Sequence, residues 1–138
     1  MPASAGPSFS ERLLSRFLDF PERRIPAAAR RTVLLCMEDT IGVGLAASAL
    51  GVGVAGSTVA LEAGGPDEAA VWGSGRGSGR ADAALANGML AHALDFDDTH
   101  PAAIMHASAV NIPVALALGE ATGAPAHEIL AAAALGYE

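Results

Sequence analysis

An uncharged run at residues 40–61 places the strongest constraint on how this chain can fold, because 22 residues are enough for a helix to cross a membrane. Either lipid or protein must cover such a run. Five glycines interrupt it and small Ala and Ser residues fill much of the rest, so the large apolar side chains that drive membrane insertion are sparse. We therefore expect two buried helices with a break near residues 50–53, and no membrane partner.

Apolar residues recur at helical spacing along most of the chain. A first helix is expected to start after Ser8 or Ser10 and to end at Pro21. Residues 69–72 are a strand candidate, and the Gly-rich composition of residues 73–79 is typical of a flexible turn. The expected fold class is therefore all-α (mainly helical), with one short β-strand near residues 69–73. The other predicted helices cover about residues 26–49, 54–63, 80–96, 111–122 and 125–138.

The charge balance excludes one class of partner. Eight Arg and no Lys stand against fifteen acidic residues, a net charge of −7, whereas sequence-independent nucleic-acid binding needs many cations to neutralise phosphates. Cys36 is the single cysteine, so no disulfide can form within the chain, as is usual in a reducing compartment. The first ten residues lack the basic and apolar regions of a secretory signal. We therefore expect a cytoplasmic protein that does not bind nucleic acid.

The densest group of polar residues lies at residues 92–100, with sequence His-Ala-Leu-Asp-Phe-Asp-Asp-Thr-His. If the preceding helix persists through it, His92, Asp95 and Thr99 share one helical face and Asp97 points elsewhere. A proline at position 101 disfavours helix at the residue before it. A polar loop should therefore follow and bring His106 back toward the group.

Three interpretations of this group remain open from residue types alone. An imidazole and a carboxylate with different pKa values can remove a proton next to a carbonyl and return one elsewhere. Alternatively, Asp95, Asp97, Asp98 and His100 could bind a divalent metal ion, since carboxylate and imidazole suit such ions. The third possibility is structural, with the carboxylates and Thr99 only ending a helix and holding the loop.

Several short motifs together resemble the 2-methylcitrate dehydratase family (MmgE/PrpD), which also includes cis-aconitate decarboxylase and iminodisuccinate epimerase. The similarity extends from about Phe17 to Glu138. The motifs are Asp-Thr-Ile-Gly-Val-Gly at 39–44, Ala-Val-Trp-Gly at 70–73, Ala-Ala-Leu-Ala-Asn-Gly at 83–88, the polar group at 92–100, His-Ala-Ser at 106–108 and Gly-Tyr-Glu at 136–138.

The resemblance implies a large helical domain built from both ends of a longer chain, a smaller α/β lid domain inserted between them, and usually a homodimer. Residues 1–138 are similar only to the N-terminal part of that helical domain, so the lid and the C-terminal helices are absent. The last predicted helix has no terminating residue, which also indicates a truncation. Pairing with the remainder of the fold or with a second copy is expected.

The resemblance also implies a chemistry. Family members act on small di- or tricarboxylates by proton abstraction, without a metal or other cofactor. Asp95 and Thr99 match active-site residues of the cis-aconitate decarboxylase branch, and His106 matches the histidine of a His-Pro-Ser element that transfers a proton. In that role Asp95 would position or ionise a partner and Thr99 would hydrogen-bond a substrate carboxylate, while Asp98 and His100 are assigned to substrate binding.

The expected function is therefore the N-terminal part of a metal-independent lyase, with 2-methylcitrate dehydration as the representative reaction. Family active sites also use Lys and His residues from later segments, and this chain has no Lys. We expect weak or no turnover by these residues alone. The alternative is a non-catalytic, truncated paralogue that serves as a helical interaction or oligomerisation module.

Overall fold

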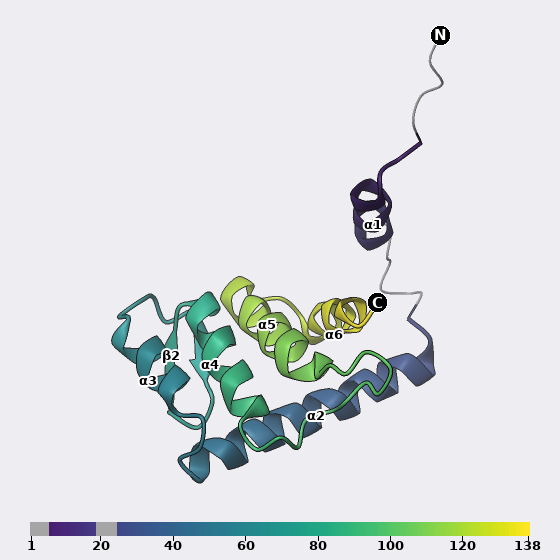
Figure 1. Cartoon of the computed structure of the whole chain (residues 1–138). Coiled ribbons are helices and arrows are strands. Elements are labelled where there is room, and N and C mark those ends of the chain that lie inside the picture. Colours follow the sequence, from purple (N-terminus) through teal and green to yellow (C-terminus); the bar gives the residue numbers. More distant parts are fainter. Residues whose placement is uncertain (1–5, 19–24) are drawn as a thin grey trace.

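The computed structural model describes residues 6–18 and 25–138 and is mainly helical, which confirms the expected fold class (Figure 1). Figure 1 shows α4, α5 and α6 on one side of the long helix α2, while α1 stands apart. The elements are α1 (Phe9–Leu18), α2 (Ala27–Ala49), α3 (Ala55–Glu62), β1 (Ala69–Val71), β2 (Arg76–Ser78), α4 (Arg80–His92), α5 (Ala107–Thr122) and α6 (Ala126–Gly136).

The uncharged run forms two helices with a break between them, as its glycines predict. α2 ends at Ala49, and Gly51 and Gly53 then adopt φ angles of 71°, a left-handed conformation that glycine takes without strain. Among the described residues, α2 is the helix long and apolar enough to cross a membrane by length and composition. A stripe that includes Val33 and Gly44 is buried against the rest of the protein, but only 22% of the apolar window of α2 is buried, so the expectation of a buried helix holds for this stripe alone.

Residues 73–79 were expected to form a flexible turn, and the structure forms a turn over the first part of this range only. They form a tight turn followed by β2, which pairs antiparallel with β1 (Ala69 opposite Ser78). The other edge of β1 is held by the buried side chain of Asn87 in α4. Its Oδ1 accepts the Trp72 N–H at 2.9 Å and its Nδ2 donates to the Ala70 carbonyl at 2.9 Å. Contacts between segments distant in sequence therefore order this glycine-rich turn.

Two predicted helix ends differ from the structure, and both lie beside the polar group. α4 ends at His92 rather than at residue 96, because the chain turns there and Asp95 N–H bonds the His92 carbonyl at 3.1 Å. α5 begins at Ala107 rather than near residue 111. The Asp98 carboxylate accepts the Ser108 N–H at 3.0 Å and so satisfies one of the donors that a helix N-terminus leaves unpaired.

The helices pack closely because their contacting faces carry small residues. Alanine makes up most of the buried apolar residues, and Leu90 and Ile112 are the largest fully buried side chains. A Cβ at Gly88 of α4 would lie 2.9 Å from the Ala109 carbonyl oxygen, so the backbones of α4 and α5 approach closely at this point. Pro113 lies inside α5, where its ring nitrogen cannot bond that carbonyl. The α4 and α5 pair thus forms a fixed frame for the loop between them.

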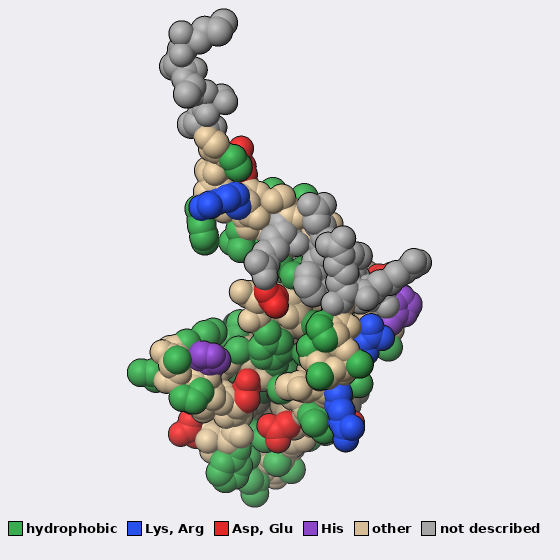
Figure 2. Space-filling view, turned by 90° about the vertical axis from the view of Figure 1, so that its right-hand side faces the viewer, with side chains coloured by type: hydrophobic (Ala, Val, Ile, Leu, Met, Phe, Trp, Pro, Cys, Tyr) green, Lys and Arg blue, Asp and Glu red, His purple; other side chains and the backbone are tan. Residues whose placement is uncertain are grey.

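The outer faces of several helices expose large apolar side chains. In α1, Leu13, Leu14, Phe17 and Leu18 are all partly or largely exposed. Figure 2 shows hydrophobic side chains spread over the visible face, with separate acidic and basic side chains between them. These faces lack a covering partner within the described residues.

Candidate active site

The loop between α4 and α5, residues 93–106, positions the polar group. Two of its non-glycine residues have positive φ angles, 56° at Asp95 and 51° at Ile104, a conformation that β-branched residues rarely adopt. A backbone bridge closes the end of the loop, where His100 N–H donates to the Met105 carbonyl at 2.9 Å. The loop therefore folds back on itself and returns His106 to the end of α4, as the proline at 101 predicted.

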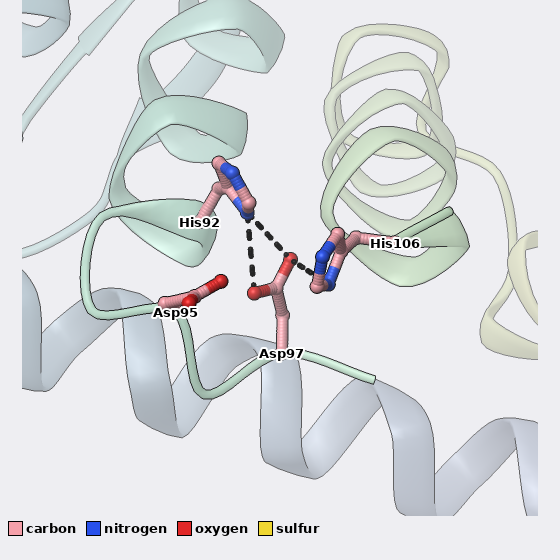
Figure 3. Close-up of side chains that lie close together, drawn as sticks. All are labelled: His92, Asp95, Asp97 and His106. Carbon is pink, nitrogen blue, oxygen red and sulfur yellow. Dashed lines mark hydrogen bonds and ion pairs between the residues drawn. The ribbon is translucent and has the colours of Figure 1, made fainter. Parts of the chain in front are cut away.

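Asp97 lies at the centre of the site, between two imidazole rings (Figure 3). Its side chain is fully buried, with 0% exposed. His92 Nδ1 lies 3.0 and 3.2 Å from the two carboxylate oxygens, and His106 Nδ1 lies 3.5 Å from Oδ2. The ring centroids are 4.9 Å apart. We call His92, Asp97 and His106 the His–Asp–His cluster.

Asp95 and Thr99 lie at the rim of this cluster. The Asp95 carboxylate is exposed, and one of its oxygens lies within 4.8 Å of ligating atoms of all three cluster residues. Thr99 Oγ1 lies 3.4 Å from His106 Nδ1, so this hydroxyl and the Asp97 carboxylate approach the same ring nitrogen. The structure therefore brings the three predicted catalytic residues, Asp95, Thr99 and His106, to one place.

The prediction that a continued helix brings these residues together is wrong. His92, Asp95 and Thr99 do not stack on one helical face, because α4 ends at His92 and the later residues belong to the loop. Asp97 does not point elsewhere but forms the centre of the cluster. His92 and Asp97 were therefore not among the residues predicted to be catalytic or to bind substrate, although Asp97 was one of the four candidate metal ligands. The available signal was a histidine in the last turns of the helix predicted over residues 80–96, with an acidic residue five positions later, close enough for one turn of chain to join them.

The two predicted substrate-binding residues make backbone contacts instead of joining the cluster. Asp98 accepts the Ser108 N–H at the start of α5. His100 is exposed, and its Nδ1 accepts the Ala103 N–H at 3.1 Å within the loop. Both residues thus hold the loop and the helix that carry His106, and their assignment to substrate remains a prediction.

A groove of about 900 Å³ runs between α4 and α5 and reaches the cluster. His92 and His106 lie at one end of it and Arg80 at the other, because the two helices run in opposite directions. Apolar side chains line the wall between these ends, namely Leu85, Met89, Val110, Val114 and Leu118. The imidazoles thus face a mainly apolar space with a polar end, which is the usual character of a small-molecule site.

The cluster has the geometry of an acid–base pair oriented by a carboxylate. A carboxylate only accepts hydrogen bonds, so the Nδ1 atom of His92 that bonds Asp97 carries a proton, and in the neutral ring Nε2 is the basic nitrogen. Asp97 thereby fixes the tautomer and the direction of the His92 ring. His106 Nδ1 lies 3.5 Å from the same carboxylate and 3.4 Å from the Thr99 hydroxyl. His106 has 30% of its side chain exposed and His92 has 55%, so both remain accessible to a ligand.

The family comparison covers most of the chain. The model of the MmgE/PrpD N-terminal domain matches residues 14–138, which contain the whole cluster and the loop that carries it. None of the curated proteins matches the chain. None of the solved structures matches it either.

Proposed function

Because the chain belongs to the MmgE/PrpD family, as the N-terminal domain of that family, we propose that it is part of a metal-independent lyase acting on a small di- or tricarboxylate. Dehydration of 2-methylcitrate is the representative reaction. The observation that carries the proposal is the buried carboxylate of Asp97 between two imidazoles, with Asp95 and Thr99 at the rim. We place the enzyme in the cytoplasm, since Cys36 is the single cysteine.

In the proposed reaction, Nε2 of His106 takes the proton from the substrate carbon next to a carboxylate. The electron pair left on that carbon forms the new double bond, and the hydroxyl group on the neighbouring carbon leaves as water with the proton that His106 took. Thr99 donates a hydrogen bond to a substrate carboxylate, and Asp95 positions the reacting groups. Asp97 is a positioning residue, because it holds the His106 ring and stabilises the imidazolium that forms.

The groove contributes few cationic groups for a substrate that carries several carboxylates. A substrate with two or three carboxylates needs cationic partners, and the groove contributes Arg80 at the end far from the cluster. Arg80 also lies 3.7 Å from Glu68, which offsets its charge. We therefore propose that cationic residues outside this domain complete the substrate site, through the remainder of the family fold or a homodimer partner.

The test is the replacement His106→Gln in the enzyme that contains this domain. We expect turnover of 2-methylcitrate to fall by about 10²- to 10⁴-fold, which is the usual contribution of a general acid or base. Turnover is followed by the ultraviolet absorbance of the conjugated product. His127→Gln is the matched control, because His127 lies in the first turn of α6, outside the site. Wild-type turnover by the His106 variant would refute the assigned role.

The exposed apolar faces favour a second candidate, a non-catalytic helical interaction module. Leu18 of α1 has 77% of its surface exposed and Val110 in the groove has 71%. Large apolar surfaces of this kind mark sites of protein association. Sedimentation of the purified chain decides the matter, since an interaction module should form a dimer or bind the rest of the fold. A folded, stable monomer would argue against the interaction module.

A further inference from the structure

The atoms of the His–Asp–His cluster are spaced like the ligands of a small metal ion. A tetrahedral zinc site with bonds of about 2.0–2.1 Å places its ligand atoms roughly 3.3–3.4 Å apart. The two measured separations lie on either side of this value, at 3.0 Å for His92 Nδ1 and 3.5 Å for His106 Nδ1, both to Asp97 Oδ2. One ligand atom of each of the three residues also lies within 4.8 Å of those of the other two, so the backbone already brings the three ligands together.

We propose that His92, Asp97 and His106 bind one divalent transition-metal ion, for which Zn²⁺ is the best match. Two imidazole nitrogens and one carboxylate oxygen suit zinc and its neighbours, whereas Mg²⁺ and Ca²⁺ prefer sites made of oxygen alone. The fourth position falls to the Asp95 carboxylate, which has an oxygen within 4.8 Å of the other three ligand atoms, or to water. Binding of this ion does not rest on the proposed lyase activity, which uses no metal.

Charge and access also favour a cation at this point. Within the described residues, the buried Asp97 carboxylate forms ion pairs with two imidazoles, those of His92 and His106. A second carboxylate, that of Asp95, lies at the rim of the cluster. With neutral imidazoles the group carries net negative charge, so an ion of charge +2 compensates it. An ion can reach the point from solvent, because His92 is more than half exposed.

The ion and the proton compete for the same atoms. An Nδ1 atom that binds a metal cannot also carry the proton that it gives to Asp97, so metal binding releases protons from the cluster. The ion would also tie the ring of His106 to Asp97 and remove its freedom to exchange a proton with substrate. Zn²⁺ is therefore expected to inhibit the proposed reaction rather than support it.

The direct experiment measures Zn²⁺ binding to the full chain without a histidine tag, in competition with a chromophoric chelator. We expect one ion per chain. His92→Gln and His106→Gln should each weaken binding by more than about 100-fold, since the loss of a ligand exceeds the 10- to 100-fold cost of losing an outer partner. His127→Gln, the matched control in α6, should bind as the wild type does. Bound Co²⁺ should show the strong visible absorption of a four-coordinate site.

Two results would overturn the proposal, and circular dichroism of every variant establishes that it is folded. One is failure of the wild-type chain to bind a stoichiometric Zn²⁺ ion. The other is unchanged affinity in folded His92 and His106 variants, which would place the ion elsewhere. These results are distinguishable from failure of the lyase proposal, because binding is measured without substrate and turnover is measured without added metal.

Discussion

Gly42 and Gly44 lie two residues apart in α2, but only Gly44 faces the body of the protein. A Cβ at Gly44 would lie 2.6 and 2.8 Å from two ring carbons of Trp72, whereas nothing lies within 4 Å of a Cβ at Gly42. Both are interior helical positions. Replacing each by alanine is the same chemical change, so the pair separates helix propensity from packing.

The expected magnitudes have opposite signs. Alanine is about 1 kcal/mol more favourable than glycine inside a helix, so Gly42→Ala should raise the free energy of unfolding by about that amount. Gly44→Ala has the same gain, but carbon atoms pack at about 3.5–4.0 Å and its Cβ would be about 1 Å too close to the Trp72 ring. Trp72 is 8% exposed and cannot move freely, so we assign the upper cost of overpacking, about 3 kcal/mol. The net effect is a loss of about 2 kcal/mol.

The assay is urea unfolding of the wild-type chain and the two variants. Trp72 is the single tryptophan, so its fluorescence reports on the packing contact, and far-ultraviolet circular dichroism reports on the helices. The difference between the two variants should be about 3 kcal/mol, and it contains only the cost of the overlap. Equal stability of Gly42→Ala and Gly44→Ala would refute the contact between α2 and Trp72.

Two further predictions concern the loop and the end of α6. Ile104 has a φ of 51°, a strained conformation for a β-branched residue, and 86% of its surface is exposed. Ile104→Asn should relieve this strain and raise the free energy of unfolding by about 1 kcal/mol in urea titrations. A destabilised variant would contradict the argument that the backbone is strained at this position. Burial raises the pKa of Tyr137 to about 12, against 10.0 for a free side chain, although its hydrogen bond with Ser108 lowers it. Because the folded state keeps the phenol protonated, the stability it contributes is complete below pH 10 and falls as the pH rises toward 12. Absorbance of this single tyrosine should titrate near pH 12, and a midpoint near 10 would refute the burial argument.

Helix periodicity and glycine placement predicted most of the fold, because these are local properties of the chain. The ends of α4 and α5 were harder to place. Ala93 and Leu94 continue the helical pattern past His92, and only the left-handed conformation of Asp95 shows that the helix has stopped. In the same way, nothing local marks Asp98 as the acceptor that lets α5 start at Ala107.

The candidate site was predicted in composition but not in arrangement. The resemblance selected Asp95, Thr99 and His106, and the structure brings these side chains together. It could not select Asp97, because aspartate is rarely buried and residue type alone favours an exposed position. Burial of that carboxylate depends on two imidazoles, one at the end of α4 and the other on the residue before α5. Such a tertiary contact cannot be read from the spacing of residues.

The side chains that bond the outer edge of β1 also affect whether a second copy of the chain can pair with this strand. A short sheet normally presents unpaired N–H and C=O groups at its edge, and these groups can template aggregation. In β1 the outward N–H of Ala70 donates to the Glu120 carboxylate at 2.6 Å. The Asn87 side chain donates to the Ala70 carbonyl and accepts the Trp72 N–H. Amide and carboxylate groups from two helices thus occupy this edge of β1 as a third strand would, so a second molecule cannot extend the sheet from there.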